Sequence, residues 1–438
     1  MTGLIMAAQL IVGLSIIVTL HELGHFMAAR AFGIRVEKFF LFFDAWNFKF
    51  FSFKKGDTEY GVGWLPLGGY VKIAGMIDES MDKEALKQPM QPWEFRSKPA
   101  WQRLIVMLGG VIMNFILGVI IFTFITLHYE KQYLPAQAIE NGIYAYDLGK
   151  MVGFKTGDKI VSIDGKKLDR FKDIATPLTL MGSKITIDRN GEKVNIIIPD
   201  TFYKKFGKES RGLFIEPDNF AFVVDSVLPN SNAANAGVRK NDKIINAAGF
   251  EINSFGDFKE TTQHNKGSVM QVVAIRNMDT LKFDVLVDSL GYVGLVASNP
   301  PYKQEKYNFA EGLKYGWKDG IGILYANIKG MGRIFSGEVK ASESLQGPIG
   351  IANIYGGIWI WPRFWYLTGM ISFILAFMNL LPIPALDGGH VMFLSWEAIT
   401  RRQLSEKFME RSQIVGMVIL IALMVFAVFN DLLKYIFN

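Results

Sequence analysis

The chain has 438 residues, of which half are hydrophobic and 20% are charged, so it is too apolar for a purely soluble protein and too charged for a bare bundle of membrane helices. Its net charge of +6 is modest and spread along the chain, which argues against a nucleic-acid partner. It contains no cysteine, which excludes thiol catalysis and any disulfide framework.

The first predicted element is a membrane helix that ends in a metal-binding pattern. An uncharged run from Leu4 to Leu20 leads directly into His21-Glu22-Leu23-Gly24-His25. In a helix, His21 and His25 lie one turn apart on the same face and can reach one zinc ion, with Glu22 beside them as general base. The alternative is a pair of structural histidines. Two histidines and a glutamate next to lipid are costly unless paired or metal-bound, which favours a zinc site.

Between this helix and the next span, two β-rich runs contain closely spaced glycines. Thr58 to Trp64 and Pro66 to Ile73 predict a membrane-associated β-hairpin near the metal. A peptide bond inside a helix has its carbonyl hydrogen-bonded, so a substrate must be drawn out as a strand, and an exposed sheet edge would hold it. The alternative is a hairpin that only packs against the helices. The candidate substrate-binding positions are Gly61, Gly63, Gly68 and Gly69.

Three further uncharged stretches are long enough to cross a bilayer, which gives four expected spans: Leu104 to Leu127, Trp365 to Leu386 and Ile414 to Asn430. Lysines and arginines gather after the first span, before the second and between the last two, so these flanks are expected in the cytoplasm. The stretch from about Tyr129 to Pro362 is then expected on the opposite side. In the second span, Gly110, Asn114 and Gly118 share one face, which favours a helix-packing seam over a substrate contact.

The exported stretch contains an internal repeat. Residues 153–161 align with 237–245 at an offset of 84 residues, and the match continues from Gly165 and Gly249 to Asp173 and Asp257. Each copy has the turns and alternating apolar strands of a small α/β domain. Downstream, Tyr307 to Phe335 has the pattern of an amphipathic helix at the membrane surface, and a Gly-Pro segment at 347–351 breaks it.

A third metal ligand is expected at the end of the third span, because a catalytic zinc site takes three protein ligands and an open position. Asp387 follows Pro382 and Pro384, which bend or end the helix, and is the first choice. His390 competes on chemical grounds, and periodicity does not decide between them. In the alternative interpretation, Asp387 is only a helix cap.

These motifs together resemble the site-2 proteases, and within them the bacterial RseP-type enzymes with tandem PDZ domains. His21 to His25 matches the family's zinc pattern, Asn379 to Gly388 matches its Asn-x-x-Pro-x-Pro-x-Leu-Asp-Gly pattern, and Pro66 to Lys72 is similar to its hairpin signature. The segment Leu41 to Trp46 departs from the Gly-Phe-Gly-Pro that the family often carries. The resemblance implies that Asp387 completes the zinc site and that Asn379, with Pro382, helps to hold an extended substrate.

The fold class expected from these features is a polytopic α-helical membrane protein with a membrane-associated β-hairpin and two inserted PDZ-like α/β domains. The expected divisions are 1–128 for the first membrane part, 129–218 and 219–303 for the PDZ-like domains, 304–345 for the surface helix and 346–438 for the second membrane part. The repeat either captures peptide tails or only excludes bulky substrates.

The resemblance implies a zinc-dependent intramembrane endopeptidase in the inner membrane of a bacterium that also has an outer membrane. The active site would face the cytoplasm and the PDZ-like domains the periplasm. Its expected partners are the bilayer and pre-trimmed single-span proteins, such as anti-sigma factors or remnant signal peptides. The main alternative is a noncatalytic, membrane-anchored peptide receptor with a structural zinc, against which the retained Glu22 argues. A transporter with a His and Asp proton relay ranks last.

Overall fold

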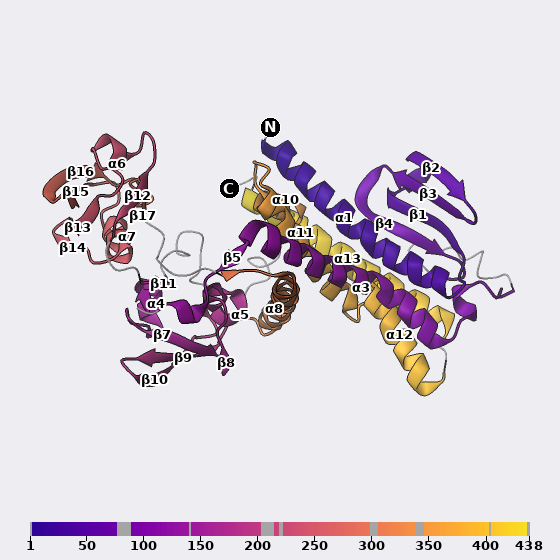
Figure 1. Cartoon of the computed structure of the whole chain (residues 1–438). Coiled ribbons are helices and arrows are strands. Elements are labelled where there is room, and N and C mark those ends of the chain that lie inside the picture. Colours follow the sequence, from indigo (N-terminus) through magenta and orange to yellow (C-terminus); the bar gives the residue numbers. More distant parts are fainter. Residues whose placement is uncertain are drawn as a thin grey trace. The chain divides into compact units, whose positions relative to one another are not determined.

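The computed structural model describes residues 2–76, 89–139, 142–202, 214–218, 222–297, 305–338, 346–402 and 404–435. The chain forms two compact units (Figure 1). One unit combines Met1–Lys131 with Tyr307–Asn438, and the other is Gln132–Lys306.

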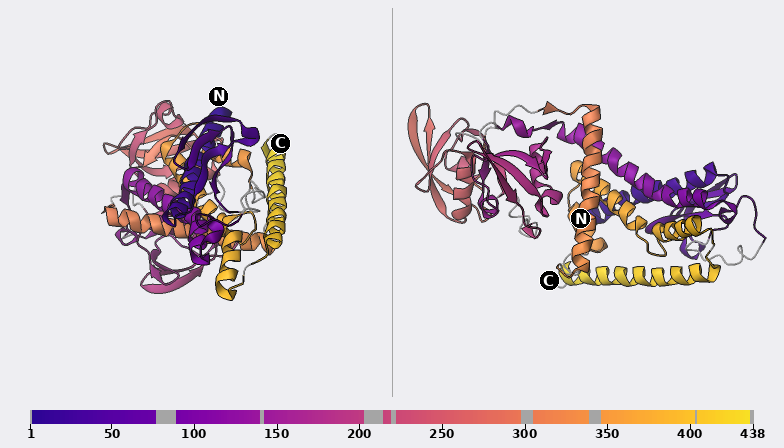
Figure 2. Two further views of the ribbon diagram at one scale, coloured as in Figure 1. Left: turned by 90° about the vertical axis from the view of Figure 1, so that its right-hand side faces the viewer. Right: turned by 90° about the horizontal axis from the view of Figure 1, so that it is seen from below.

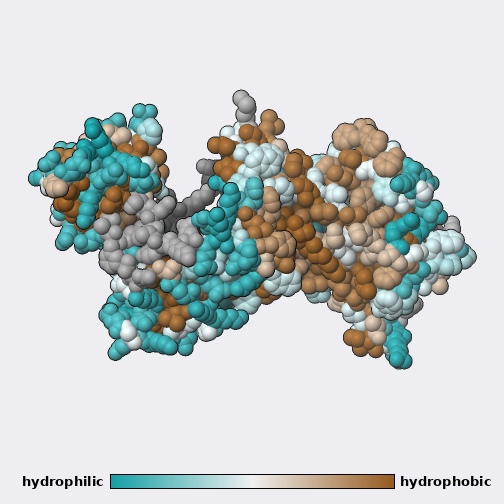
Figure 3. All heavy atoms as spheres, in the orientation of Figure 1, coloured by the Kyte–Doolittle hydropathy of each residue, from teal (hydrophilic) through white to brown (hydrophobic). Residues whose placement is uncertain are grey.

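Within the described residues of the first unit, four helices are long and apolar enough to cross a membrane, in agreement with the expected number. They are α1 (Thr2–Ala31), α3 (Ala100–Ile125, extended by a π-helical turn, η3, Thr126–Glu130), α11 (Trp361–Leu380) and α13 (Glu406–Tyr435). Apolar side chains cover much of the surface of this unit in Figure 3. The third span ends at Leu380 and not at Leu386 as expected, because Pro382 and Pro384 cannot continue a helix.

The first unit also contains the helical elements η1 (Ala45–Asn47), η2 (Phe95–Ser97), α8 (Phe309–Phe335), α10 (Pro348–Tyr355) and α12 (Asp387–Thr400). Helix α8 begins at a capping box, in which Asn308 and Glu311 each accept from the other's backbone N–H. It packs against the second span, since a Cβ on Gly316 would meet the Thr123 hydroxyl at 2.5 Å. The amphipathic segment is thus one helix that lies against α3.

Small residues set how closely the spanning helices approach one another. Gly24 of α1 faces Gly109 of α3, and a Cβ on Gly109 would lie 2.6 Å from the carbonyl oxygen of Gly24. Gly118 of α3 lies under the ring of Phe373 in α11, and a Cβ on Gly118 would lie 2.7 Å from Cε1 of that ring. Such contacts replace the hydrophobic driving force that helices lack in lipid. The seam expected on α3 therefore packs against two other helices.

The last span, α13, is a single long helix (Figure 2) that is anchored near its C-terminal end. The buried carboxylate of Asp431 accepts hydrogen bonds from the backbone N–H groups of Gly347, at 3.0 Å, and Gly350, at 2.8 Å. These N–H groups begin α10 and have no partner within that helix. The Gly-Pro segment is thus the N-terminus of α10, capped by a residue about 80 positions away.

A four-stranded sheet follows α1: β1 (Val36–Phe43), β2 (Lys49–Lys55), β3 (Thr58–Gly63) and β4 (Leu65–Ile73), in the order β2-β3-β1-β4. Strand β1 pairs in parallel with β3 and antiparallel with β4, and β2 pairs antiparallel with β3. The two glycine-rich runs are therefore strands, but the expected hairpin between them is wrong. A two-residue turn, Gly56-Asp57, joins β2 to β3, whereas only Trp64 separates β3 from β4 and β1 lies between them.

The second unit contains the repeat. Its first half holds β5 (Gln132–Tyr133), η4 (Ala136–Ala138), β6 (Ile143–Ala145), α4 (Asp147–Met151), β7 (Lys159–Ile163), β8 (Lys166–Lys167), η5 (Phe171–Ala175), α5 (Pro177–Leu180), β9 (Lys184–Arg189), β10 (Glu192–Ile197) and β11 (Ile215–Pro217). Its second half holds β12 (Val224–Val227), α6 (Asn232–Asn235), β13 (Lys243–Ala247), β14 (Phe250–Glu251), α7 (Phe255–His264), β15 (Val269–Arg276), β16 (Asp279–Leu286) and β17 (Leu295–Ala297), and β18 (Glu305–Lys306) pairs with β5.

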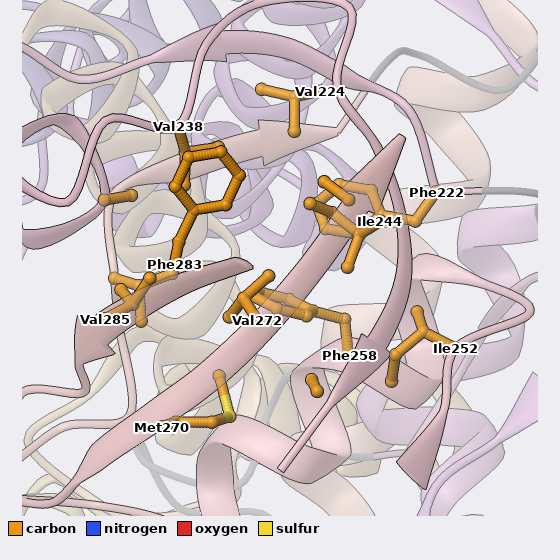
Figure 4. Packing of buried hydrophobic residues seen from close by; sticks show 14 of the residues in the cluster. Phe222, Val224, Val238, Ile244, Ile252, Phe258, Met270, Val272, Phe283 and Val285 are labelled. Atoms are coloured by element: carbon orange, nitrogen blue, oxygen red, sulfur yellow. The ribbon is translucent and has the colours of Figure 1, made fainter. Parts of the chain in front are cut away.

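Both halves have the same strand order, β10-β9-β7-β8 in one and β16-β15-β13-β14 in the other, and each adds a two-stranded pair. They also share an ion pair between a buried aspartate and a partly exposed arginine. Arg189 binds Asp158 and the carbonyl of Gly153, and Arg276 binds Asp242 and the carbonyl of Gly237. In the second half, labelled apolar side chains of the two sheets and α7 point toward one another in one core (Figure 4).

The two halves contact each other where α7 of the second half meets β6, α4 and β11 of the first. Tyr144 donates a hydrogen bond across this contact to Glu260 of α7 at 2.7 Å, and Tyr146 donates within the first half to Glu216 of β11 at 2.9 Å. Lys150 and Lys259 also bind these two carboxylates. Burial raises the pKa of both tyrosines, so they stay protonated and remain hydrogen-bond donors. This contact covers one side of α7.

Candidate metal centre

The two histidines of the first motif lie on one buried face of α1, as their spacing predicts. His21 and His25 present their Nε2 atoms 3.2 Å apart. Space for the two rings comes from Gly110 of α3. A Cβ at Gly110 would clash with Nε2 of His25 and lie 2.5 Å from Cε1 of His21. The crossing of α1 and α3 therefore forms the wall of this site.

The carboxylate of Asp387 meets both imidazoles. Asp387 is the first residue of α12, and its Oδ2 lies 3.1 Å from Nε2 of His21 and 3.3 Å from Nε2 of His25. The preceding loop turns sharply, with Ala385 in the left-handed region at φ 84°. Gly389, two residues later, packs against this loop, since a Cβ there would lie 2.6 Å from the carbonyl oxygen of Ile383. The Leu-Asp-Gly-Gly segment thus folds the chain back toward the histidines.

These three donors fit a tetrahedral metal ion. Ligands about 2.0–2.1 Å from zinc in tetrahedral geometry are about 3.3–3.4 Å apart. The observed separations between the three atoms run from 3.1 to 3.3 Å. Oδ2 of Asp387 is also buried with no hydrogen-bond donor among the described residues, a cost that a bound cation removes. Two imidazole nitrogens and a carboxylate oxygen form a zinc donor set.

The outer nitrogens of the two imidazoles contact α3. Nδ1 of His25 lies 2.8 Å from the carbonyl oxygen of Val106. A carbonyl only accepts, so this Nδ1 carries the proton and Nε2 keeps its lone pair. Nδ1 of His21 lies 3.2 Å from the side-chain amide of Asn114. The sequence pattern had placed Asn114 on a packing seam, and its contact with a candidate ligand depends on the helix crossing.

Glu22 lies between the histidines and strand β4. Its carboxylate faces the backbone of Val71, and a Cβ on Gly69 would lie 3.5 Å from its Cγ. Among the described strands β4 is an edge of the sheet, because it pairs only with β1. Glu22, the histidines, Asp387 and β4 line one cavity of about 760 Å³. An acid–base residue, a metal-binding group and an edge strand therefore meet in one space.

Not every candidate residue lies in this cavity. Asn379 does, with its amide nitrogen 3.3 Å from Nε2 of His21, and so do Gly68 and Gly69. Pro382 is exposed and does not line the cavity. Gly61 and Gly63 lie in the interior strand β3, where neighbouring residues leave no room for a side chain. Pro382, Gly61 and Gly63 therefore do not line this cavity.

His390, the competing ligand, also lines the cavity but is absent from the three-residue group. The lining residues that the sequence reasoning missed include Gln413 and Met417 of α13. Gln413 is buried although it precedes an apolar run, and this position was its only sequence signal. The helix that supplies them thus closes one side of the cavity.

Charged groups lie at the sheet side of the cavity. Nζ of Lys38 is 2.9 Å from Oδ2 of Asp44, and the hydroxyl of Tyr70 donates to Oδ1 of the same carboxylate at 2.8 Å. Burial alone would raise the pKa of Asp44, but these hydrogen bonds hold it below its ordinary value. The segment that departs from the family pattern therefore contributes an ionised carboxylate to the cavity lining.

Comparison with known proteins agrees with this geometry. The model of peptidase family M50 matches residues 9–423. The chain belongs to peptidase family M50. It is 30% identical to a Pasteurella multocida (strain Pm70) protein named "Putative zinc metalloprotease", over 98% of each chain. It is 28% identical to the regulator of sigma-E protease RseP of Escherichia coli (strain K12), over 97% of each chain. A third relative, the metalloprotease MmpA of Caulobacter vibrioides, is 27% identical over 99% of this chain and 96% of its own.

These findings confirm the resemblance drawn from the motifs. This M50 chain is a metalloprotease of the site-2 type, and with its four spanning helices it is a multi-pass membrane protein. The names of two relatives state a metalloprotease and one states zinc. The three-residue group is the set of described side chains positioned to hold such an ion.

Proposed function

We propose that this protein is a zinc-dependent endopeptidase that cleaves transmembrane segments, with zinc held by His21, His25 and Asp387. The observation that carries the proposal is the meeting of these three donor atoms with Glu22 and the edge strand β4 in one cavity. A structural zinc site has four protein ligands and no need of an adjacent base. Here three ligands and a glutamate share a cavity large enough for a peptide segment.

The chemistry divides between the ion and the side chains. When bound, zinc polarises the scissile carbonyl and makes water a better nucleophile. Glu22 takes the proton from the attacking water and delivers it to the leaving amine nitrogen, as a general base and then a general acid. The contact of its carboxylate with β4 places it beside the strand where the peptide would lie. The amide of Asn379 is close enough to hydrogen-bond the peptide next to the metal.

The substrate would bind as an added strand along β4. Helical peptide bonds have their carbonyls occupied by intrahelical hydrogen bonds, so a helix must unwind before water can attack. The free N–H and C=O groups of an edge strand replace those lost bonds. Gly68 and Gly69 lie on the lining segment of β4, so backbone contacts there are not screened by side chains. Gly61, Gly63 and Pro382 have no part in this proposal.

The proposed substrates are single-span proteins already trimmed on the exported side, such as anti-sigma factors or remnant signal peptides. The name of the Escherichia coli relative, a regulator of sigma-E protease, supports this class. Lysines and arginines in the short flanks support an orientation in a bacterial inner membrane with the metal centre toward the cytoplasm and residues 132–306 on the periplasmic side.

The two repeated halves of the second unit are proposed to be PDZ-like domains, about 129–218 and 219–303. Their shared strand order and their equivalent Asp–Arg pairs support a common fold. Either half would take a peptide by strand addition or would act as a filter against bulky exported domains. The remaining proposed divisions, 1–128, 304–345 and 346–438, follow the membrane parts and the α8 segment.

The alternative function is a noncatalytic peptide receptor in which the metal is structural. It predicts that zinc and peptide bind while no peptide bond is cleaved. The position of Glu22 beside the edge strand β4 favours the protease.

The test compares wild type with Glu22→Gln in liposomes, using a trimmed single-span substrate and measuring cleavage and zinc content together. The amide keeps the size of Glu22 but cannot act as a base, so we expect at least about a 100-fold loss of cleavage with zinc retained. Glu59→Gln is the matched control, because Glu59 pairs with Lys49 and does not line the cavity.

Equal cleavage by wild type and Glu22→Gln would overturn the proposed mechanism. Zinc binding with no cleavage by either protein, across several trimmed substrates, would support the receptor. Loss of cleavage in Glu59→Gln to the same degree would show that the assay reports folding and not chemistry.

A further inference from the structure

The two candidate histidine ligands are held on their outer sides by the same helix, but in different ways. Nδ1 of His25 donates to the main-chain carbonyl of Val106, which any residue at that position would provide. Nδ1 of His21 meets a side chain, the amide of Asn114, at 3.2 Å. Asn114 is 1% exposed, so water does not compete for this contact.

The orientation of the Asn114 amide decides which nitrogen of His21 carries the proton. With the amide nitrogen toward Nδ1, as the atoms are placed, Nδ1 must accept, and the proton then sits on Nε2. That proton would point at Oδ2 of Asp387 and Nε2 of His25, where a ligand lone pair is needed. This orientation also leaves Oδ1 of Asn114 buried without a partner among the described residues.

The opposite orientation of the amide removes both conflicts. The oxygen and nitrogen of an asparagine side chain have nearly the same shape, and their assignment follows from the hydrogen bonds they make. With Oδ1 turned toward His21, the Nδ1–H group donates to it and Nε2 keeps its lone pair. The orphaned acceptor gains a donor.

We propose that Asn114 is a positioning residue that accepts a hydrogen bond from Nδ1–H of His21 and so holds this ligand in its metal-binding tautomer. The proposal rests on the proposed zinc site and deepens it. Asn114 is not one of the three candidate ligands and acts on the metal through His21.

The geometry of α3 explains how two groups eight residues apart contact two histidines that are one turn apart. These groups are the carbonyl of Val106, which contacts His25, and the side chain of Asn114, which contacts His21. Backbone carbonyls of a helix point toward its C-terminus, whereas side chains lean toward its N-terminus. The carbonyl of Val106 and the side chain of Asn114 therefore converge on the level of Gly110, which lies midway between them. There the absence of a Cβ admits both rings.

The backbone at Asn114 is itself fixed. The hydroxyl of Ser372 in α11 donates to the carbonyl oxygen of Asn114 at 2.7 Å in a buried contact. This bond ties α3 to α11 at the residue that orients the ligand, without reaching the amide. Ser372 is therefore a matched control for the Asn114 side chain.

The test measures zinc affinity of the full-length protein in detergent by competition with a chelator, in the Glu22→Gln background so that no turnover is needed. Asn114→Leu removes the acceptor, and we expect zinc affinity to fall about 10–100-fold. Asn114→Asp restores an acceptor of the same shape and is expected to bind zinc within about threefold of the parent. Ser372→Ala is expected to leave the affinity unchanged.

A packing role alone predicts the opposite order, because a buried aspartate in a membrane helix is worse than leucine. Equal affinity of Asn114→Leu and the parent, or equal weakness of the Leu and Asp variants, would overturn the proposal.

A second measurement needs no variant of Asn114. Nitrogen-15 NMR of histidine-labelled, zinc-free protein reports which ring nitrogen of His21 carries the proton when no metal fixes it. We expect the Nδ1–H form, and an Nε2–H form would contradict the proposal whatever the variants do. These readouts are independent of cleavage, so failure of the proposed protease function and failure of the role of Asn114 give different results.

Discussion

Gly110 lies against the imidazole of His21, so that a Cβ on Gly110 would be 2.5 Å from Cε1 of that ring. The same Cβ would clash with Nε2 of His25. A glycine one turn before Asn114 in the second span therefore provides the space in which two metal ligands of the first span meet.

The first prediction concerns this space. Gly110→Ala is expected to displace both imidazoles and to lower zinc affinity at least about tenfold, because a methyl group in a closed core forces its neighbours to move. Zinc content and chelator competition measure it. Gly118→Ala is the control, since its methyl would meet the ring of Phe373 and not a ligand. Zinc affinity that stays unchanged in Gly110→Ala would show that the rings do not need this space.

The second prediction decides the third ligand. Asp387→Ala leaves two imidazoles, and we expect zinc binding to become too weak to survive dialysis, with complete loss of cleavage. His390→Ala is expected to retain zinc, because His390 is outside the three-residue group. Metal analysis of the dialysed proteins checks both variants. Loss of zinc from His390→Ala with retention by Asp387→Ala would reverse the assignment.

The third prediction concerns the anchor of α13. In Asp431→Asn the amide can accept from one backbone N–H, but its NH2 group faces the other donor of the Gly347 and Gly350 pair. We expect the free energy of unfolding to fall by about 1–3 kcal/mol, the usual cost of an unsatisfied buried group. Denaturation in mixed micelles measures it, with Ser15→Ala, which removes an exposed hydrogen bond, as the control. An unchanged free energy of unfolding in Asp431→Asn would show that the Asp431 carboxylate does not stabilise the N-terminus of α10.

The fourth prediction concerns pH and the contact between the two halves of the second unit. Burial tends to raise the pKa of Glu260, but hydrogen bonds from Tyr144 and Lys150 outweigh it and hold the pKa below its ordinary value. Because the pKa of Glu260 is lowered, its carboxylate stabilises the contact fully at pH values above its ordinary pKa near 4.5. This stabilisation is lost as the pH falls through the lowered pKa.

Hydrogen exchange of α7 measured from pH 7 down to pH 3 tests this dependence. We expect protection of the face toward Tyr144 to decrease at the acidic end in wild type. In Glu260→Gln, which does not titrate, the same protection should not change with pH. If protection of α7 falls equally with pH in wild type and in Glu260→Gln, groups other than Glu260 cause the loss.

Sequence patterns found the parts of this protein that depend on local spacing. Two histidines four residues apart must share a helix face, and a carboxylate after two prolines must lie where a span ends, so the candidate ligands and their helices were predictable. Uncharged runs of bilayer length predicted the four spans, and the 84-residue offset predicted that the second unit contains two related halves. Each of these signals is contained within one element or one repeat.

Tertiary structure decided which distant elements are neighbours. Strand β1 inserts between β3 and β4 and leaves β4 as an edge, a pairing that no local pattern of Gly61, Gly63, Gly68 or Gly69 specifies. Asn114 meets His21 only because Gly24 and Gly109 let α1 and α3 cross closely at that level. Backbone pairing and helix crossing depend on contacts between residues far apart in the chain, and for that reason the sequence located the ligands but not the residues that hold them in place.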